Sequence, residues 1–148
     1  MKRMLGAASA AAAAAVACFA VGPAGLASAD PELNGTYTLT VDQTQSTTTG
    51  FPIKDPEVET TQWVIASCGA GCAHVTTPEN PKGGGDLNLV NGRWELTKEF
   101  TLPMPSCPPG PTVTNVTSLD PATLQGTEVN TNHCLDNVIT SPATLTPA

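Results

Sequence analysis

Beyond position 34, the chain consists of short runs rich in Thr and Val that Pro and Gly interrupt about every 10 to 15 residues. β-branched residues favour extended strands, and Pro and Gly favour the turns between them. We find no long segment with the 3.6-residue apolar spacing of an amphipathic helix. The pattern predicts an all-β domain of about eight strands, folded as a small antiparallel β-barrel or a strongly curved two-layer sheet.

Alternation of apolar and polar residues gives the clearest predicted strands one inward face. Tyr37, Leu39 and Val41 share a face of the first strand. Trp63 and Ile65 share a face of the second. Strands are predicted over 35–41, 60–67, 72–77, 87–90, 93–100, 112–119, 124–129 and 137–140, with a loop over 42–56 after the first.

The strongest local signal is a hairpin around Asn91-Gly92. This dipeptide is preferred in two-residue type I′ turns, because both central positions of such a turn need a positive φ. In the strand that follows, Trp94, Leu96 and Phe100 fall on one side and are expected to face inward. Lys98 shares their parity, so we expect it near a rim of the sheet where its ammonium group can reach water.

Residues 1–29 have the features of a secretory signal peptide. Lys2 and Arg3 are followed by an Ala-rich apolar run to Val21, and Ala27-Ser28-Ala29 supplies small residues at the cleavage site. We expect cleavage after Ala29, which leaves a single all-β domain of residues 30–148 that is secreted or associated with the cell envelope.

Two alternatives to cleavage at this site remain open. Cys18 could carry a lipid, although Ala15-Val16-Ala17 before it is a poor match to a lipoprotein signal. The apolar run could instead stay as an anchor, but it is shorter than the roughly 20 residues that span a bilayer.

The predicted mature chain is strongly acidic. It keeps four basic residues against thirteen acidic ones, a formal balance of −9, because Lys2 and Arg3 leave with the signal. Such a chain is repelled by nucleic acid and by anionic membrane surfaces. We therefore expect neither nucleic-acid binding nor membrane insertion after cleavage; the sequence does not reveal the oligomeric state.

The four cysteines of the mature chain are expected to form two disulfides, because export places them in an oxidising compartment. Gly69-Ala70-Gly71 separates Cys68 from Cys72 and can form a tight turn that brings the two Cα atoms within disulfide range. The remaining pair would then be Cys107 with Cys134. This second bridge closes the longer loop and should stabilise the domain more.

A zinc site is the competing interpretation of these cysteines, since His74 and His133 could complete a ligand set. The spacing C-x₃-C differs from the usual C-x₂-C, and export favours oxidation, so we predict neither a metal nor another cofactor. Catalytic signatures such as G-x-S-x-G and H-E-x-x-H are absent from the sequence. We predict no catalytic residues and no enzymatic activity.

The chain resembles small exported four-cysteine proteins of mycobacteria and related actinobacteria. The resemblance covers about residues 35–134 and is carried by a Trp-bearing strand, a close cysteine pair, a G-x-W strand and two further cysteines. The matching segments are Trp63 to Val75, Asn91 to Trp94 and Thr123 to Thr127. It implies a fold and an exported location but no known activity.

With few aromatic and many small inward residues, a closed sheet would leave room at one mouth. Tyr37, Trp63 and Trp94 are the candidate binding residues there. We predict a non-enzymatic binding module for a small apolar or amphiphilic molecule. The alternatives are a structural or immunogenic envelope protein without a ligand, and an envelope hydrolase that uses His74 or His133.

Overall fold

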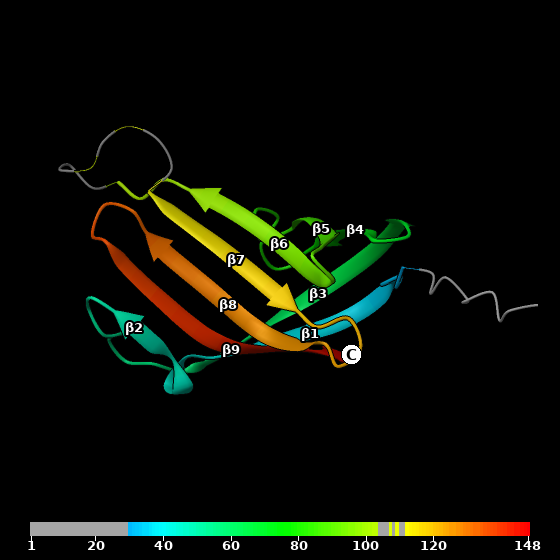
Figure 1. The fold of residues 1–148 in the computed structure, drawn as a ribbon, viewed down its shortest axis with the longest axis horizontal. Helices are drawn as coiled ribbons and strands as arrows, with labels where there is room; N and C mark the ends of the chain where they lie inside the picture. The colour runs from blue at the N-terminus through cyan, green and yellow to red at the C-terminus, as the bar shows by residue number, and fades with distance from the viewer. Residues whose placement is uncertain (1–29, 104–106, 108, 110–111) are drawn as a thin grey trace, which may run out of the picture.

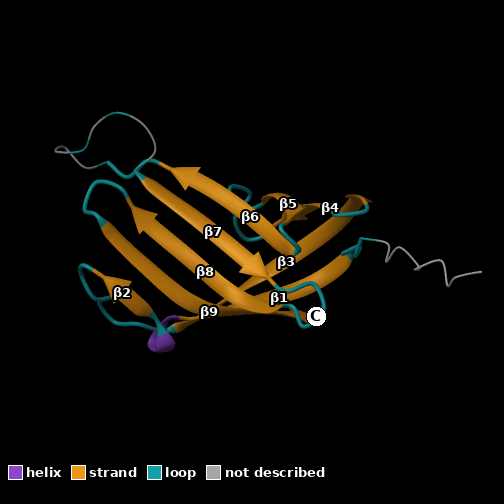
Figure 2. Cartoon of the chain, in the orientation of Figure 1, coloured by secondary structure: helices purple, strands orange, loops and turns teal. Residues whose placement is uncertain are grey.

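The computed structural model describes residues 30–103, 107, 109 and 112–148. These residues form nine strands and one 3-10 turn, shown in purple in Figure 2. The elements are β1 (Gly35–Asp42), η1 (Gln43–Gln45), β2 (Thr47–Thr49), β3 (Val58–Gly69), β4 (Cys72–Thr76), β5 (Gly85–Val90), β6 (Arg93–Phe100), β7 (Val113–Leu119), β8 (Gln125–Asn132) and β9 (Asn137–Pro147).

Eight of the strands close into an antiparallel barrel, which confirms the predicted fold class. The strand order is β1-β3-β4-β5-β6-β7-β8-β9, and β9 pairs back onto β1. In Figure 1, β6 to β9 lie side by side across the front of the barrel, and β1, β3, β4 and β5 lie behind them. Closure pairs β1 on both of its sides and removes the two long edges that an open sheet of these strands would have.

The first strand of the barrel is broken, and this break explains two differences from the sequence predictions. The predicted loop over 42–56 contains η1 and the short strand β2, which pairs with β9 beyond the break. The predicted strand 137–140 extends to Pro147. Pro142 does not end it, because Pro142 lies in the interval of β9 between its β2 and β1 partners, where a missing N–H is tolerated.

The two ends of the barrel differ in how they are built. At the closed end, tight turns join β3 to β4, β5 to β6 and β7 to β8. At the open end lie the longer connections 77–84 and 101–112, the β8–β9 turn and β2. Figure 1 shows β2 and the β8–β9 turn together on the left, opposite the C-terminus.

The apolar core fills the closed half of the barrel. Leu33, which precedes β1, is 6% exposed and belongs to this cluster, so the segment before β1 helps to cover the closed end. Leu124 packs against the cluster from the β7–β8 turn. The other members are Leu39, Val41, Trp63, Ile65, Ala73, Val75, Leu87, Trp94, Leu96, Leu119, Ala143 and Leu145.

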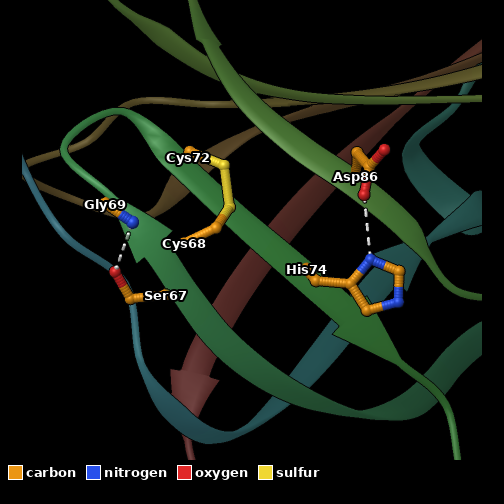
Figure 3. Close-up of a disulfide and its surroundings, with 6 residues drawn as sticks. All are labelled: Ser67, Cys68, Gly69, Cys72, His74 and Asp86. Carbon is orange, nitrogen blue, oxygen red and sulfur yellow. Dashed lines mark hydrogen bonds and ion pairs between the residues drawn. A yellow bond between two sulfur atoms is a disulfide. The ribbon is translucent and has the colours of Figure 1, made fainter.

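Both predicted disulfides are present. Cys68–Cys72 bridges the β3–β4 turn at the closed end, with its Cα atoms 5.1 Å apart (Figure 3). Cys107–Cys134 joins the β6–β7 connection to the β8–β9 turn at the open end, with its Cα atoms 5.5 Å apart. Each end of the barrel therefore carries one covalent cross-link.

The predicted hairpin is confirmed in turn type and in register. Val90 pairs with Arg93 across the turn, and Asn91 and Gly92 have φ values of 49° and 77°. Trp94 and Leu96 are fully buried, as predicted. Lys98 is half-buried, and its pairing with Asn115 places it toward the open end.

The predicted signal peptide of residues 1–29, including Cys18, lies outside the described residues, so its cleavage stays a prediction. Within the described part of the chain, no helix has the length and apolar character needed to cross a membrane.

Candidate ligand pocket at the open end of the barrel

The open end of the barrel contains a pocket of about 280 Å³ that reaches down to Trp63. Its wall is formed by strands β1, β3, β6, β7 and β8, and the 77–84 connection supplies the remaining side. The lining residues are Leu39, Val41, Glu59, Thr61, Trp63, Thr77, Glu79, Asn80, Gly83, Lys98, Phe100, Asn115 and Glu128.

The floor of the pocket is apolar. Trp63, Leu39 and Val41 line the floor and also belong to the apolar core. Trp63 is only 1% exposed. Phe100, at the end of β6, is 43% exposed and contributes apolar surface at the mouth. The floor and one side of the mouth are therefore apolar.

The 77–84 connection forms one wall because β4 and β5 stop short of the open end. Two consecutive turns shape it: Asn80 N–H donates to Thr77 O at 3.1 Å, and Gly83 N–H donates to Asn80 O at 2.8 Å. The Thr77 hydroxyl also donates to Asn80 O. A Cβ at Gly83 would stand 2.7 Å from Thr77 Oγ1, so this approach requires glycine.

A network of polar side chains lines the opposite wall, inside the barrel. Asn115 Nδ2 donates to Asn130 Oδ1 at 2.8 Å, and Asn130 Nδ2 donates to Glu128 Oε1 at 3.2 Å. The fully buried hydroxyl of Thr117 donates to Glu128 Oε2 at 3.4 Å. The network holds the Glu128 carboxylate in the barrel interior, where it lines the pocket.

Strand register explains why this network gathers inside. Asn115 pairs with both Lys98 on β6 and Asn130 on β8, and Thr117 pairs with Glu128. Directly paired residues in a sheet point to the same face, so the partners of an inward residue on both neighbouring strands also point inward. The sequence does not signal these residues, because the inward face of β8 carries the polar side chains of Glu128 and Asn130 and so shows no apolar alternation.

Charge around the pocket is predominantly negative. Three carboxylates, those of Glu59, Glu79 and Glu128, face a single ammonium group, that of Lys98. Lys98 Nζ donates to Gly83 O at 3.4 Å, and Glu59 Oε1 accepts from Gln43 Nε2 at 2.7 Å. The pocket therefore combines an acidic rim with an apolar floor.

Two buried polar side-chain atoms among the described residues have no hydrogen-bond partner. One is Trp94 Nε1, which lies in the apolar closed half. The other is Oδ1 of Asn115, a residue that is only 6% exposed and lines the pocket. A buried acceptor left unpaired costs about 1–3 kcal/mol, so Asn115 Oδ1 marks a place where a hydrogen-bond donor would be favoured.

The structure distributes the three predicted binding residues between the two halves. Trp63 lines the pocket. Trp94 is fully buried in the core, and Tyr37 is half-buried and packs against that core. The pocket lining does not include Tyr37 or Trp94, so Trp63 is the predicted residue that a ligand in this pocket could touch.

The histidines lie outside the barrel interior. His74 Nδ1 is 2.9 Å from Asp86 Oδ1 on the neighbouring strand, with both side chains more than half exposed (Figure 3). A surface recess of about 390 Å³ beside His74 is lined by Thr76 and Thr77 but by no serine. Both threonine hydroxyls donate to backbone carbonyls, so neither is presented to His74 as a nucleophile.

His133 is engaged elsewhere, since its Nε2 is 2.7 Å from Thr114 Oγ1. Across the residues that the structure describes, no group of three or more His, Cys, Asp or Glu side chains is placed to hold a metal ion. The four cysteines are consumed by the two disulfides.

Comparisons with known proteins support the fold. No family model and no curated protein matches the chain. A solved structure described as the monomer form of the PknI sensor domain of M. tuberculosis matches with a TM-score of 0.60. The two share 20% sequence identity, and the match covers 79% of this chain and 88% of that one.

Proposed function

We propose that this protein is a non-enzymatic binding module that takes one small amphiphilic molecule into the open end of its barrel. The observation that carries the proposal is the pocket that reaches Trp63, with its apolar floor, its acidic rim and the unpaired Asn115 Oδ1. Small-molecule sites are concave and mostly apolar, with a few polar groups that orient the ligand. The similarity to a structure named as a sensor domain is compatible with this role.

The pocket also limits the size of the ligand. A volume of 280 Å³ corresponds to about nine water molecules at about 30 Å³ each. A six-carbon chain with one polar head is therefore a suitable probe. The apolar part would lie on Trp63 and Val41, and the head would remain at the rim with the charged side chains.

We propose an exported location for this module. Two disulfides fit an oxidising compartment, and the predicted signal supplies a route to it. N-terminal sequencing of exported material should begin at Asp30. A lipid-modified start at Cys18, or an intact residue 1, would contradict the predicted processing.

The binding proposal is tested by filling the pocket. Hexan-1-ol should shift the NMR signal of the Trp63 indole N–H and leave that of Trp94 nearly unchanged. Thr61→Phe places a ring in the pocket and should abolish the shift, because Thr61 faces inward and lines it. Thr60→Phe is the matched control, since Thr60 is the exposed neighbour on the same strand and should leave the shift intact. The proposal fails if hexan-1-ol moves neither indole signal up to its solubility limit.

A further inference from the structure

From the same pocket we infer the chemical class of the ligand's polar head: it is a hydrogen-bond-donating cation, such as a primary ammonium group, on a short apolar chain. This inference rests on the proposed function and makes it more specific. It depends on the direction of the hydrogen bonds inside the barrel and on the charges at the rim.

The direction of the network is set by Glu128. An ionised carboxylate can only accept hydrogen bonds, so Asn130 must turn its Nδ2 toward Glu128 Oε1, as observed at 3.2 Å. The Oδ1 of Asn130 then points to Asn115 and accepts from its Nδ2 at 2.8 Å. Asn115 is left with its own Oδ1 unpaired. Reversing either amide would bring two acceptors together.

The consequence is that the unpaired side-chain atom of Asn115, a residue of the pocket lining, is an acceptor and not a donor. Its side chain is 94% buried, and it lines the pocket between Lys98 and Glu128. A ligand with a donor can satisfy Asn115 Oδ1, whereas a ligand with only acceptors would leave it unpaired. This observation involves Glu128 but does not depend on the other two carboxylates of the rim, those of Glu59 and Glu79.

The rim adds a preference for positive charge. Glu59, Glu79 and Glu128 outnumber Lys98, and part of their surroundings is the low-polarity floor of the pocket, where charges are screened less than in water. A carboxylate or phosphate head would face three like charges. An ammonium head gains from the carboxylates and supplies the donor that Asn115 lacks.

Lys98 is the residue that could compete with the ligand. It pairs with Asn115 across β6 and β7, but its Nζ donates to Gly83 O instead. Removing its charge should therefore favour an ammonium ligand, because one repelling group leaves the pocket while the barrel wall stays intact.

Three probes of one chain length test the inference: hexylammonium, hexan-1-ol and hexanoate, each titrated into the intact protein by calorimetry and by the Trp63 indole signal. Hexylammonium should bind about tenfold or more tightly than hexan-1-ol, and hexanoate most weakly, because a charge-assisted hydrogen bond is worth about one to two orders of magnitude in affinity. Added salt should weaken hexylammonium and leave hexan-1-ol unaffected.

Variants then assign the preference to named groups. Glu128→Gln should lower hexylammonium affinity about tenfold with little effect on hexan-1-ol. The new amide carries no charge, and because it can also donate, it no longer fixes the direction of the hydrogen bonds to Asn130 and Asn115. Glu57→Gln makes the same charge change outside the pocket lining and should leave both probes unchanged. Glu79→Gln, on the exposed connection, should weaken hexylammonium several-fold even if Glu128→Gln fails to fold. Lys98→Met should tighten hexylammonium and weaken hexanoate.

Two failures can be distinguished. If the three probes bind with equal affinity, or if hexanoate binds most tightly, the inferred cation is wrong and the binding module stands. If none of the probes binds and the Trp63 signal stays fixed, both the inference and the proposed function are overturned.

Discussion

The closed and open halves of this barrel share strands such as β7 and β8 but fill their interior in opposite ways. Along β7, the inward side chains run from Leu119 at the closed end through Thr117 and Asn115 beside the pocket to Val113 at the open end. Their inward partners on β8 change in the same direction, from Gly126 to Glu128 and Asn130. The comparison teaches that inward parity fixes where a side chain points but not whether it is apolar, since the polar inward residues of β7 and β8 gather beside the pocket.

In the closed half, β7 and β8 approach each other closely at Gly126. A Cβ added to Gly126 would stand 1.8 Å from the carbonyl oxygen of Ser118 on the neighbouring strand, which leaves no space for a side chain. At the open end, the corresponding interior is a pocket rather than a core. We conclude that the closed half contains the packed apolar core, whereas the open half contains a pocket lined by polar and charged side chains.

The largest expected effect concerns the cross-links at the two ends. Chain-entropy estimates give about 3.6 kcal/mol for Cys107–Cys134 and about 2 kcal/mol for Cys68–Cys72, because the first joins residues 27 apart and the second residues 4 apart. The paired variants Cys107→Ser/Cys134→Ser and Cys68→Ser/Cys72→Ser should lose unfolding free energy in that ratio in urea titrations. Equal losses of unfolding free energy in the two paired variants would contradict the prediction that Cys107–Cys134 stabilises the protein more than Cys68–Cys72.

The next effect compares one apolar truncation in each half. Leu119→Ala, at a fully buried position of the closed half, should lower the unfolding free energy by about 3 kcal/mol, since it leaves a cavity in a packed core. Phe100→Ala, at the 43% exposed mouth, should cost less than about 1 kcal/mol although it removes a larger side chain. Urea denaturation of both variants checks this, and similar losses would show that the mouth is part of the core.

The closed half was largely predictable from sequence, and the open half was not. Apolar alternation identified Leu39, Trp63 and Leu96 as inward, and turn chemistry identified Asn91-Gly92, because these signals are local. The pocket depends on which strands are neighbours. The residues next to Asn115 in the sequence do not indicate that Lys98 and Asn130 flank it, because strand pairing and register bring these three residues together.

The disulfides and the last strand show the same division. Cys68–Cys72 followed from a five-residue turn, and its identification left a single partner for Cys107. β9 is longer than the predicted strand 137–140. Proline is tolerated at position 142 because this part of β9 lies opposite the break between β1 and β2, which only the tertiary structure shows.

A smaller effect tests the turn that anchors the closed end. Gly92→Val should lower the unfolding free energy by about 1 kcal/mol or more, because a β-branched residue is strained at a φ of 77°. Gly92→Ala should lose less, and an added Cβ meets no neighbour within 4 Å, so strain rather than collision would be measured. Equal denaturation midpoints for wild type and both variants would contradict the turn type.

The smallest expected effect compares one surface carboxylate at each end in acid. Hydrogen bonds from the backbone N–H groups of Thr123 and Ala122 hold the pKa of Asp120 below its ordinary value of 3.8. At the open end, the Thr44 hydroxyl is the main cause that lowers the pKa of Asp42.

Because both carboxyl groups have a lower pKa in the folded state than in the unfolded state, their stabilisation is present above about pH 3.8 and is lost as the pH falls through the folded pKa. Asp120→Asn and Asp42→Asn should each lower stability at neutral pH, where the wild-type carboxylate is ionised, and the difference from wild type should shrink below pH 4. We expect the larger change from Asp120, since its turn positions Leu124, which packs on the core and accepts a hydrogen bond from Leu145 N–H at 2.9 Å. Urea midpoints measured from pH 2.5 to 7 decide the order. A greater change in the Asp42 variant would contradict this order and place the more acid-sensitive contact at the open end.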